Sequence, residues 1–345
     1  MRRRRWLTRE QFLDYLGATN LIPGPNSTEL AIHIGRARAG WPGLLVAGAC
    51  FILPATLIVS AIAWMYTRYG ALPQAAGVLY GVKPVVIAVV LQALWSLGRT
   101  AVRSVPLAAL AIATVTAAAV GGHELVVLAG AGALMALARL RRHDNRSRLA
   151  ALPLLTTVAT GVTATAGAMA PFGLWPLFGV FVKIGAVLFG SGYVLLAFMR
   201  ADLVERLHWL TERQLLDAVA VGQVTPGPLF TTATFAGYLL GGPAGAAVAT
   251  IGIFLPAFVF VAISGPLVPR IRRSKTAGAI LDGVNVASLA LMASVTVQLG
   301  RSALIDIPTI GLAAVSAAVL IRYRINSVWL VLGGGLVGAL VFWLR

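Results

Sequence analysis

Residues 23–29 read Pro-Gly-Pro-Asn-Ser-Thr-Glu, and residues 226–232 read Pro-Gly-Pro-Leu-Phe-Thr-Thr. Proline lacks a backbone N–H and its ring clashes with the preceding helical turn, whereas glycine adopts backbone conformations that other residues avoid. Each Pro-Gly-Pro triplet therefore predicts the end of one helix and the start of another. These two breaks organise the prediction of the fold.

The sequence around the first triplet recurs around the second. The matches, all in the same order, are Trp6-Leu7-Thr8 with Trp209-Leu210-Thr211, Gln11 with Gln214, Asp14 with Asp217, Leu53-Pro54-Ala55 with Leu255-Pro256-Ala257, and Gly81-Val82 with Gly283-Val284. A series of this length indicates an internal duplication. We therefore divide the chain into a first repeat (1–148), a linker transmembrane helix (149–170) and a second repeat (171–345).

The composition places both repeats in a membrane. The 345 residues include 28 basic and 11 acidic ones, a net charge of +17. Such an excess in a soluble protein suggests a nucleic-acid partner. Only 11% of the residues are charged, however, against about 25% in ordinary globular domains, and 59% are hydrophobic, with a mean hydropathy of +0.87. We therefore expect an all-α polytopic membrane protein of about twelve spans and no nucleic-acid partner.

Each repeat is predicted to contain one helix that runs into the triplet, a short helix after it, and a long apolar helix with Leu-Pro inside. Three further apolar helices complete the repeat. The second repeat also has an opening helix, Leu177–Met199, which contains Phe189-Gly190-Ser191-Gly192. Its counterpart would lie upstream of Met1, so the first repeat is expected to lack its opening helix. Either the recorded start lies too far downstream or the protein lost a helix.

Matched helix breaks in two halves are typical of the substrate site of a transporter, because irregular backbone within a bilayer persists only when buried in protein or facing a wet cavity. A helix that starts after a break offers free N–H groups and the positive end of its dipole to an anion. The alternative, that the residues are only helix caps and kinks, fits a matched pair less well. The candidate substrate-binding residues at the breaks are Pro23, Gly24, Pro25, Asn26, Ser27, Thr28, Pro226, Gly227, Pro228, Thr231 and Thr232, and Gly190 and Gly192 join them because they allow close backbone approach.

Two of the three lysines fall within apolar segments and are further candidates for substrate binding. Lys83 and Lys183 are costly to bury unless they are paired or line a pathway, although long side chains near span ends also reach the headgroups. Glu29, one turn after the first break, is a candidate proton-coupling residue, a lysine partner or a surface residue. Asp14 and Asp217 recur at equivalent places and are expected to fix their helices against neighbours. No metal site and no cofactor are expected.

These motifs resemble the chromate transporter family. The resemblance rests on the doubled Trp-Leu-Thr, Pro-Gly-Pro and Leu-Pro-Ala pattern, on Phe189-Gly190-Ser191-Gly192, where the family usually has Phe-Gly-Gly, and on residues 81–86, Gly-Val-Lys-Pro-Val-Val. It implies an exporter of chromate, coupled to protons or aided by the membrane potential, with two halves in opposite orientations. Counts of basic residues on the two sides do not separate inverted from parallel repeats, and we prefer the inverted arrangement.

The sequence thus predicts a secondary transporter that exports chromate across the bacterial inner membrane and confers chromate resistance. A carrier for sulfate or another oxyanion and a truncated, inactive membrane relic stay open as alternatives. An enzyme is not expected, because the acidic residues lie mostly at segment ends and form no catalytic cluster. The expected partners are an oxyanion, the lipid bilayer and, as an open alternative, further copies of the chain.

Overall fold

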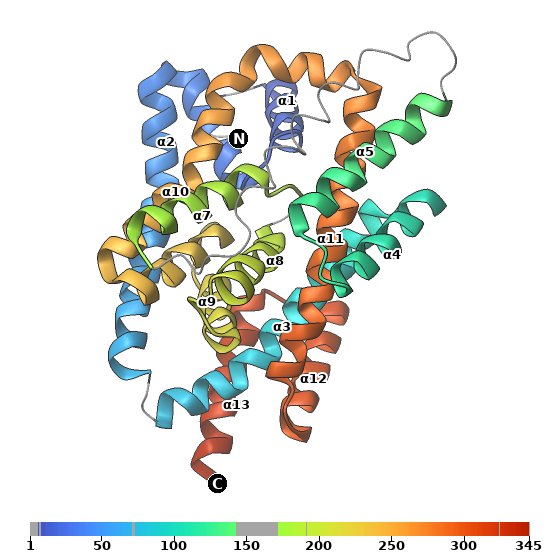
Figure 1. Ribbon diagram of the computed structural model, residues 1–345. Coiled ribbons are helices and arrows are strands. Elements are labelled where there is room, and N and C mark those ends of the chain that lie inside the picture. Colours follow the sequence, from blue (N-terminus) through green and yellow to red (C-terminus); the bar gives the residue numbers. More distant parts are fainter. Residues whose placement is uncertain are drawn as a thin grey trace.

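The computed structural model describes residues 6, 8–70, 73–142, 172–190, 192–323 and 325–344, and over these residues it contains helices and turns but no strand. The wholly helical architecture expected from the sequence is confirmed for this part of the chain. The predicted linker helix, residues 149–170, lies outside the described residues. The helices of the N-terminal part are α1 (Arg9–Thr19), α2 (Asn26–Tyr69), α3 (Pro73–Ala101), α4 (Val105–Ala119) and α5 (Glu124–Arg142) (Figure 1).

The C-terminal part repeats this order after an additional opening segment. The segment consists of α7 (Leu174–Val187), the 3-10 turn η1 (Gly192–Val194), α8 (Leu195–Met199) and the π-helix η2 (Arg200–Arg206). The helices that follow are α9 (Glu212–Val224), the 3-10 turn η3 (Leu229–Thr231), α10 (Thr232–Arg273), α11 (Lys275–Ala303), α12 (Ile307–Tyr323) and α13 (Ser327–Leu344).

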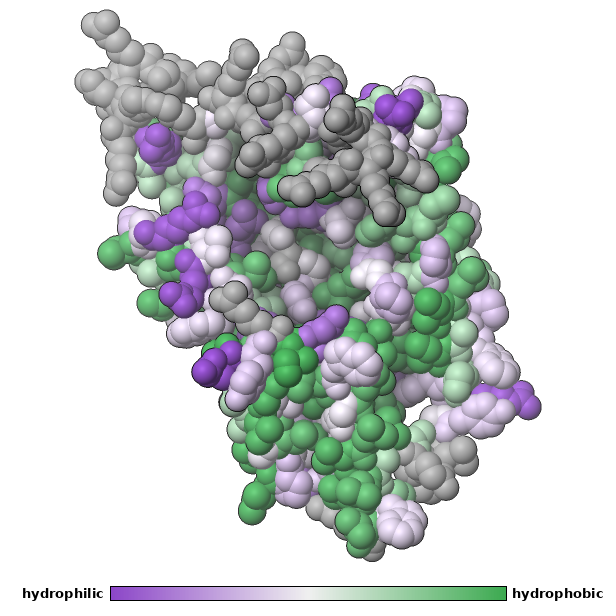
Figure 2. Space-filling model, turned by 180° about the vertical axis from the view of Figure 1, so that it is seen from behind, coloured by the Kyte–Doolittle hydropathy of each residue, from purple (hydrophilic) through white to green (hydrophobic). Residues whose placement is uncertain are grey.

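Several helices are long and apolar enough to cross a membrane. Within the described residues the candidate spans are Asn26–Tyr69, Ala75–Ala101, Leu229–Ser264, Thr276–Ala303 and Ser327–Leu344, and three shorter apolar helices accompany them. Large apolar side chains such as Leu57, Ile112 and Leu336 are exposed, as a lipid-facing surface requires. Figure 2 shows apolar residues over most of the lower part of one face. The chain is a multi-pass membrane protein, and the total of about twelve spans stays a prediction.

The helices before the triplets start in the same way. In α1 the hydroxyl of Thr8 accepts a hydrogen bond from the backbone N–H of Gln11, and the side-chain oxygen of Gln11 accepts one from the backbone N–H of Thr8. Thr211 and Gln214 form the same pair of hydrogen bonds at the start of α9. This reciprocal capping satisfies donors that the first helical turn leaves open. α1 ends at Thr19, before the first triplet, and α9 ends at Val224, before the second.

The long helices after the triplets, α2 and α10, each fold back on themselves at a glycine. Gly40 has φ +61° and Gly242 has φ +60°, the left-handed region in which glycine is preferred. The two arms then pack closely: a Cβ on Gly35 would lie 2.3 Å from the carbonyl oxygen of Gly43. Each of these helices therefore contains the predicted short helix followed by the long apolar one.

The N-terminal and C-terminal parts interlock instead of packing as separate bodies. α3 packs on α12 and α13, α11 packs on α4 and α5, and α2 packs on α10. The middle of α3, residues 85–90, is buried throughout. In Figure 1 the second arm of α2 runs toward the bottom of the view, whereas that of α10 runs toward the top. The first triplet is buried, whereas Pro226 and Gly227 of the second triplet are exposed and only its Pro228 is buried.

The segment predicted as one helix, Leu177–Met199, is wrong as a single element. α7 ends at Val187, Gly190 has φ +90°, and helical structure resumes only at Gly192. Gly190-Ser191-Gly192 interrupts the apolar sequence at this break, a local turn signal that outweighs the apolar residues on either side. The positive φ of Gly190 explains why the helix stops there. Phe189 and Gly190 therefore belong to a third helix break and not to a helix surface.

Candidate functional site

The two Pro-Gly-Pro triplets meet at one cavity of about 430 Å³. α1 and α9 bring the chain to it, α2 and η3 lead the chain away, and the break after α7 forms a further wall. We call it the Pro-Gly-Pro cavity. Its lining residues are Gly24, Pro25, Asn26, Ser27, Gly190, Gly192, Tyr193, Gly222, Gln223, Thr225, Gly227, Pro228, Leu229 and Phe230. Eight of the sequence-predicted site residues are therefore brought together here: Gly24, Pro25, Asn26, Ser27, Gly190, Gly192, Gly227 and Pro228.

The central glycines of the triplets hold the backbone in a conformation that other residues rarely adopt. Gly24 has φ +141° and Gly227 has φ +149°. A Cβ on Gly227 would lie 2.4 Å from the Cβ of Ala55, and one on Gly24 would lie 3.6 Å from the Cβ of Ala257. Each triplet thus approaches the Leu-Pro-Ala alanine of the other part of the chain. At Gly227 the space admits only glycine.

The cavity offers neutral hydrogen-bond donors. α2 starts at Asn26, and its first N–H groups have no acceptor within the helix, while Pro25 at the N-cap supplies no side-chain hydrogen bond. The side chains of Ser27, Gln223 and Thr225 add polar groups. None of the described lining residues is charged. The arrangement therefore suits an anion held by amide and hydroxyl dipoles at a helix N-terminus.

Several predicted site residues lie outside the lining. Pro23, Pro226, Thr28, Thr231 and Thr232 do not line the cavity. The hydroxyl of Thr231 donates to the carbonyl of Pro228 at 3.0 Å, and that of Thr232 donates to the carbonyl of Leu229 at 2.8 Å. Both hydroxyls are thus used within their own turn.

Lys83 is paired inside the protein. Its Nζ lies 3.2 Å from Oδ1 of Asp217, and the two side chains are 12% and 0% exposed. The hydroxyl of Tyr66 donates to Oδ2 of the same carboxylate at 2.8 Å. The group joins α2, α3 and α9, so Asp217 does fix its helix against neighbours, as expected. Lys83 does not line the Pro-Gly-Pro cavity.

Lys183 is paired as well. Its ammonium contacts the carboxylate of Asp202, which is buried and also accepts from Arg206 at 2.7 Å. Lys183 is likewise absent from the cavity lining. The charges of both intramembrane lysines are therefore matched by carboxylates of the chain, and neither is directed at the triplets.

Glu29 is fully buried beside the first triplet. Neither carboxyl oxygen has a hydrogen-bond partner within the described part of the chain. A Cβ on Gly24 would lie 2.3 Å from Oε1 of Glu29, so the carboxyl packs directly behind the cavity wall. His33, one turn later, stacks on Tyr15 with 5.5 Å between ring centres, and its Nε2 has no partner among the described residues.

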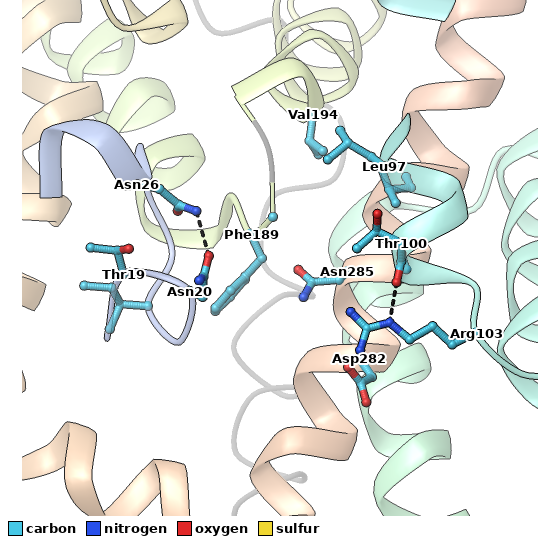
Figure 3. A pocket seen from close by; sticks show the side chains of 14 residues that line it. Thr19, Asn20, Asn26, Leu97, Thr100, Arg103, Phe189, Val194, Asp282 and Asn285 are labelled. Carbon is cyan, nitrogen blue, oxygen red and sulfur yellow. Dashed lines mark hydrogen bonds between the residues drawn. The ribbon is translucent and has the colours of Figure 1, made fainter. Parts of the chain in front are cut away.

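A second cavity of about 390 Å³ lies next to the first and shares Asn26 and Gly190 with it. Figure 3 shows Asn20 and Asn26 on one side of it, hydrogen-bonded to each other at 2.9 Å. Asn285 and Arg103 lie on the other side, and Asp282 lies near Arg103. Polar and apolar side chains both line this second cavity.

Sequence reasoning missed three polar residues of the Pro-Gly-Pro cavity, namely Tyr193, Gln223 and Thr225. Gln223 and Thr225 stand directly before the second triplet, where polar residues in an otherwise apolar stretch were a usable signal. Tyr193 follows the break after α7. Gly190 and Gly192 of the same segment were predicted to join the site, but the prediction of one continuous helix did not include the neighbouring Tyr193.

Comparisons with known proteins identify the relatives of this chain. A family model described as chromate transporter matches residues 1–137 and 175–339. A chromate transport protein of Cupriavidus metallidurans is 31% identical, with 98% of this chain and 85% of that protein covered. A probable chromate transport protein of Synechococcus elongatus is 30% identical (99% and 87% covered), and a chromate transport protein of Pseudomonas aeruginosa is 31% identical (98% and 84% covered). No solved structure matches the chain.

Proposed function

The chain belongs to the chromate transporter family, and from this premise we propose that it exports chromate across the inner membrane of a bacterium. The observation that carries the proposal is the meeting of both Pro-Gly-Pro triplets at one cavity whose described lining includes polar side chains but no charged one. A tetrahedral oxyanion needs several donors around it, and the helix start at Asn26 together with the polar side chains supplies them. The names of the relatives favour chromate over sulfate as the cargo.

We propose two inverted repeats, residues 1–148 and 171–345, joined by a linker span over 149–170. Reciprocal contacts support this. Gly24 approaches Ala257 while Gly227 approaches Ala55, and the packing of α3 on α12 and α13 mirrors that of α11 on α4 and α5. Such exchange of equivalent partners is what a two-fold relation between repeats produces. The opposite courses of α2 and α10 in Figure 1 favour inversion.

Export of a dianion uses the membrane potential directly. An inside-negative potential favours the outward movement of each negative charge by about 2.3 kcal/mol per 100 mV, so a dianion gains about 4.6 kcal/mol. An uncharged site fits this mechanism, because the substrate keeps its own charge during the crossing. We propose that the cavity residues bind the anion, while Lys83 and Lys183 act through their carboxylate partners and not by direct contact.

The first prediction concerns transport itself. Everted vesicles that contain the protein should accumulate chromate when their interior is made positive, and vesicles without the protein should not. Purified protein in liposomes with a potassium-set potential gives the same measurement without other carriers. Excess sulfate should inhibit only weakly if chromate is the cargo. Chromate accumulation that is independent of the protein would contradict the proposal.

A second prediction concerns Glu29 as the proton-coupling residue. Proton binding would neutralise this buried carboxyl, which has no hydrogen-bond partner among the residues that the structure describes, and ionisable groups within membrane spans are usually functional. The change Glu29→Gln is expected to abolish the response of chromate transport to an imposed pH gradient, while the response to an imposed potential remains. The matched control is Glu205→Gln, because that glutamate is exposed and paired with Arg200. Equal pH responses of the Glu29→Gln variant and the unchanged protein would rule out this role.

A further inference from the structure

We infer that Gln223, held in place by Tyr193, donates its side-chain amide to the transported oxyanion and sets the affinity for it. Gln223 lies in α9, two residues before Thr225, and lines the Pro-Gly-Pro cavity. The inference rests on the proposed function, since it deepens the description of the same site. It adds a recognition residue that the helix breaks alone do not identify.

The amide of Gln223 is positioned and yet unsatisfied. The side chain is buried, with 8% of the residue exposed, and its Nε2 has no hydrogen-bond partner among the described residues. Its Oε1 accepts from the hydroxyl of Tyr193 at 3.4 Å. This hydrogen bond occupies the acceptor end of the amide and leaves the NH₂ group as the end that is open for a ligand. A buried donor without a partner is costly, and an anion in the cavity would remove that cost.

The equivalent residue of the first repeat does not share this property. Asn20 stands three residues before the first triplet, as Gln223 stands before the second. The amide nitrogen of Asn20 donates to the carbonyl of Leu16 at 3.0 Å, and its oxygen accepts from Asn26 at 2.9 Å. Both ends of Asn20 are therefore used within the protein. Of these two equivalent amides, only that of Gln223 has a donor without a partner among the described residues.

The chemistry of the amide suits a doubly charged oxyanion in this cavity. An NH₂ group is a neutral donor with two hydrogens, so it binds an anion without adding a charge that would compete with release. Hydrogen bonds to ionised groups are stronger than those between neutral groups. A carboxylate at the same position would accept instead of donate and would repel the substrate. Substitutions of Gln223 can therefore test how the loss of the amide donor, or its replacement by a negative charge, changes the affinity for the anion.

The test uses the full chain in liposomes and in detergent. Gln223→Leu removes the donor and is expected to raise the KM for chromate by on the order of tenfold to a hundredfold with a smaller change in maximal rate. Gln223→Glu should raise the KM further, and Tyr193→Phe should raise it several-fold, since only the orientation of the amide is lost. The matched control is Gln214→Glu in the same helix, because glutamate also satisfies that capping position, and its KM should be unchanged.

A binding measurement keeps this inference separate from the proposed function. Thermal unfolding of the purified protein is followed with added chromate, sulfate or phosphate, and a bound anion raises the melting temperature. A rise that is lost in Gln223→Leu supports the inference for whichever anion produces it, even if that anion is not chromate. A rise that the variant retains overturns the inference and leaves the proposed function intact. The absence of any rise in the unchanged protein overturns both.

Discussion

Replacing Gly227 with alanine is expected to abolish chromate transport. The new Cβ would lie 2.4 Å from the Cβ of Ala55, a separation that forces the backbone of the second triplet or of α2 to move. The φ of +149° at Gly227 adds strain for any residue with a Cβ. Overpacking and backbone strain together cost about 2–6 kcal/mol, so the cavity wall between the two parts of the chain should not keep its shape.

A control glycine that has a positive φ but free space around its Cβ position separates the effect of backbone strain from that of the steric clash. Gly242 has φ +60°, and no atom lies within 4 Å of a Cβ built on it. Gly242→Ala carries the strain without the clash and should retain most transport. The double change Ala55→Gly with Gly227→Ala removes the clash but not the strain, and it should recover part of the activity that Gly227→Ala loses.

The measurements are chromate uptake into liposomes and the amount of monodisperse protein after purification. Uptake is compared at equal protein amount, so that a folding defect is not counted as a transport defect. Full transport by Gly227→Ala at normal abundance would contradict the close contact between the second triplet and Ala55. Failure of Ala55→Gly to improve the single variant would show that strain, and not crowding, dominates.

Local sequence chemistry was sufficient for much of the fold. The backbone chemistry of Pro-Gly-Pro predicts that one helix ends before each triplet and another begins after it, and the structure starts α2 at Asn26. The capping boxes at Thr8 and Thr211 fix the helices that precede the triplets. The proposed duplication predicts that each element of one repeat has a counterpart in the other. These features depend on residues close in sequence, and pattern reading detects such features well.

Contacts between distant segments explain what the sequence did not reveal. Lys83 and Asp217 attract each other across α3 and α9, and no local pattern pairs them. The break at Gly190 has a local signal in Gly190-Ser191-Gly192, but the positive φ of Gly190 is what shows that the helix stops there. The position of Gln223 depends on how η1 brings Tyr193 to α9. The lysines were therefore expected to be available to substrate, whereas the structure gives each a carboxylate partner.

The buried pair of Lys83 and Asp217 carries the second large prediction. Lys83→Met is expected to destabilise the protein by about 3–5 kcal/mol, because it leaves the carboxylate of Asp217 buried without its countercharge. Asp217→Leu should do similar damage by leaving the ammonium unpaired. Transport and the melting temperature in detergent should fall together in both variants. Tyr66→Phe removes only one hydrogen bond to Asp217 and should cost about 1 kcal/mol.

The double variant Lys83→Met with Asp217→Leu decides whether Lys83 acts through its partner or on the substrate. Replacing both members of a buried pair by apolar residues is often close to neutral for stability, so the double variant should melt at a higher temperature than either single variant. If Lys83 serves only to hold α3 against α9, chromate transport should return with stability. A stable double variant that does not transport would instead assign the lysine charge to the substrate, since removal of Asp217 cannot compensate for a lost contact with chromate.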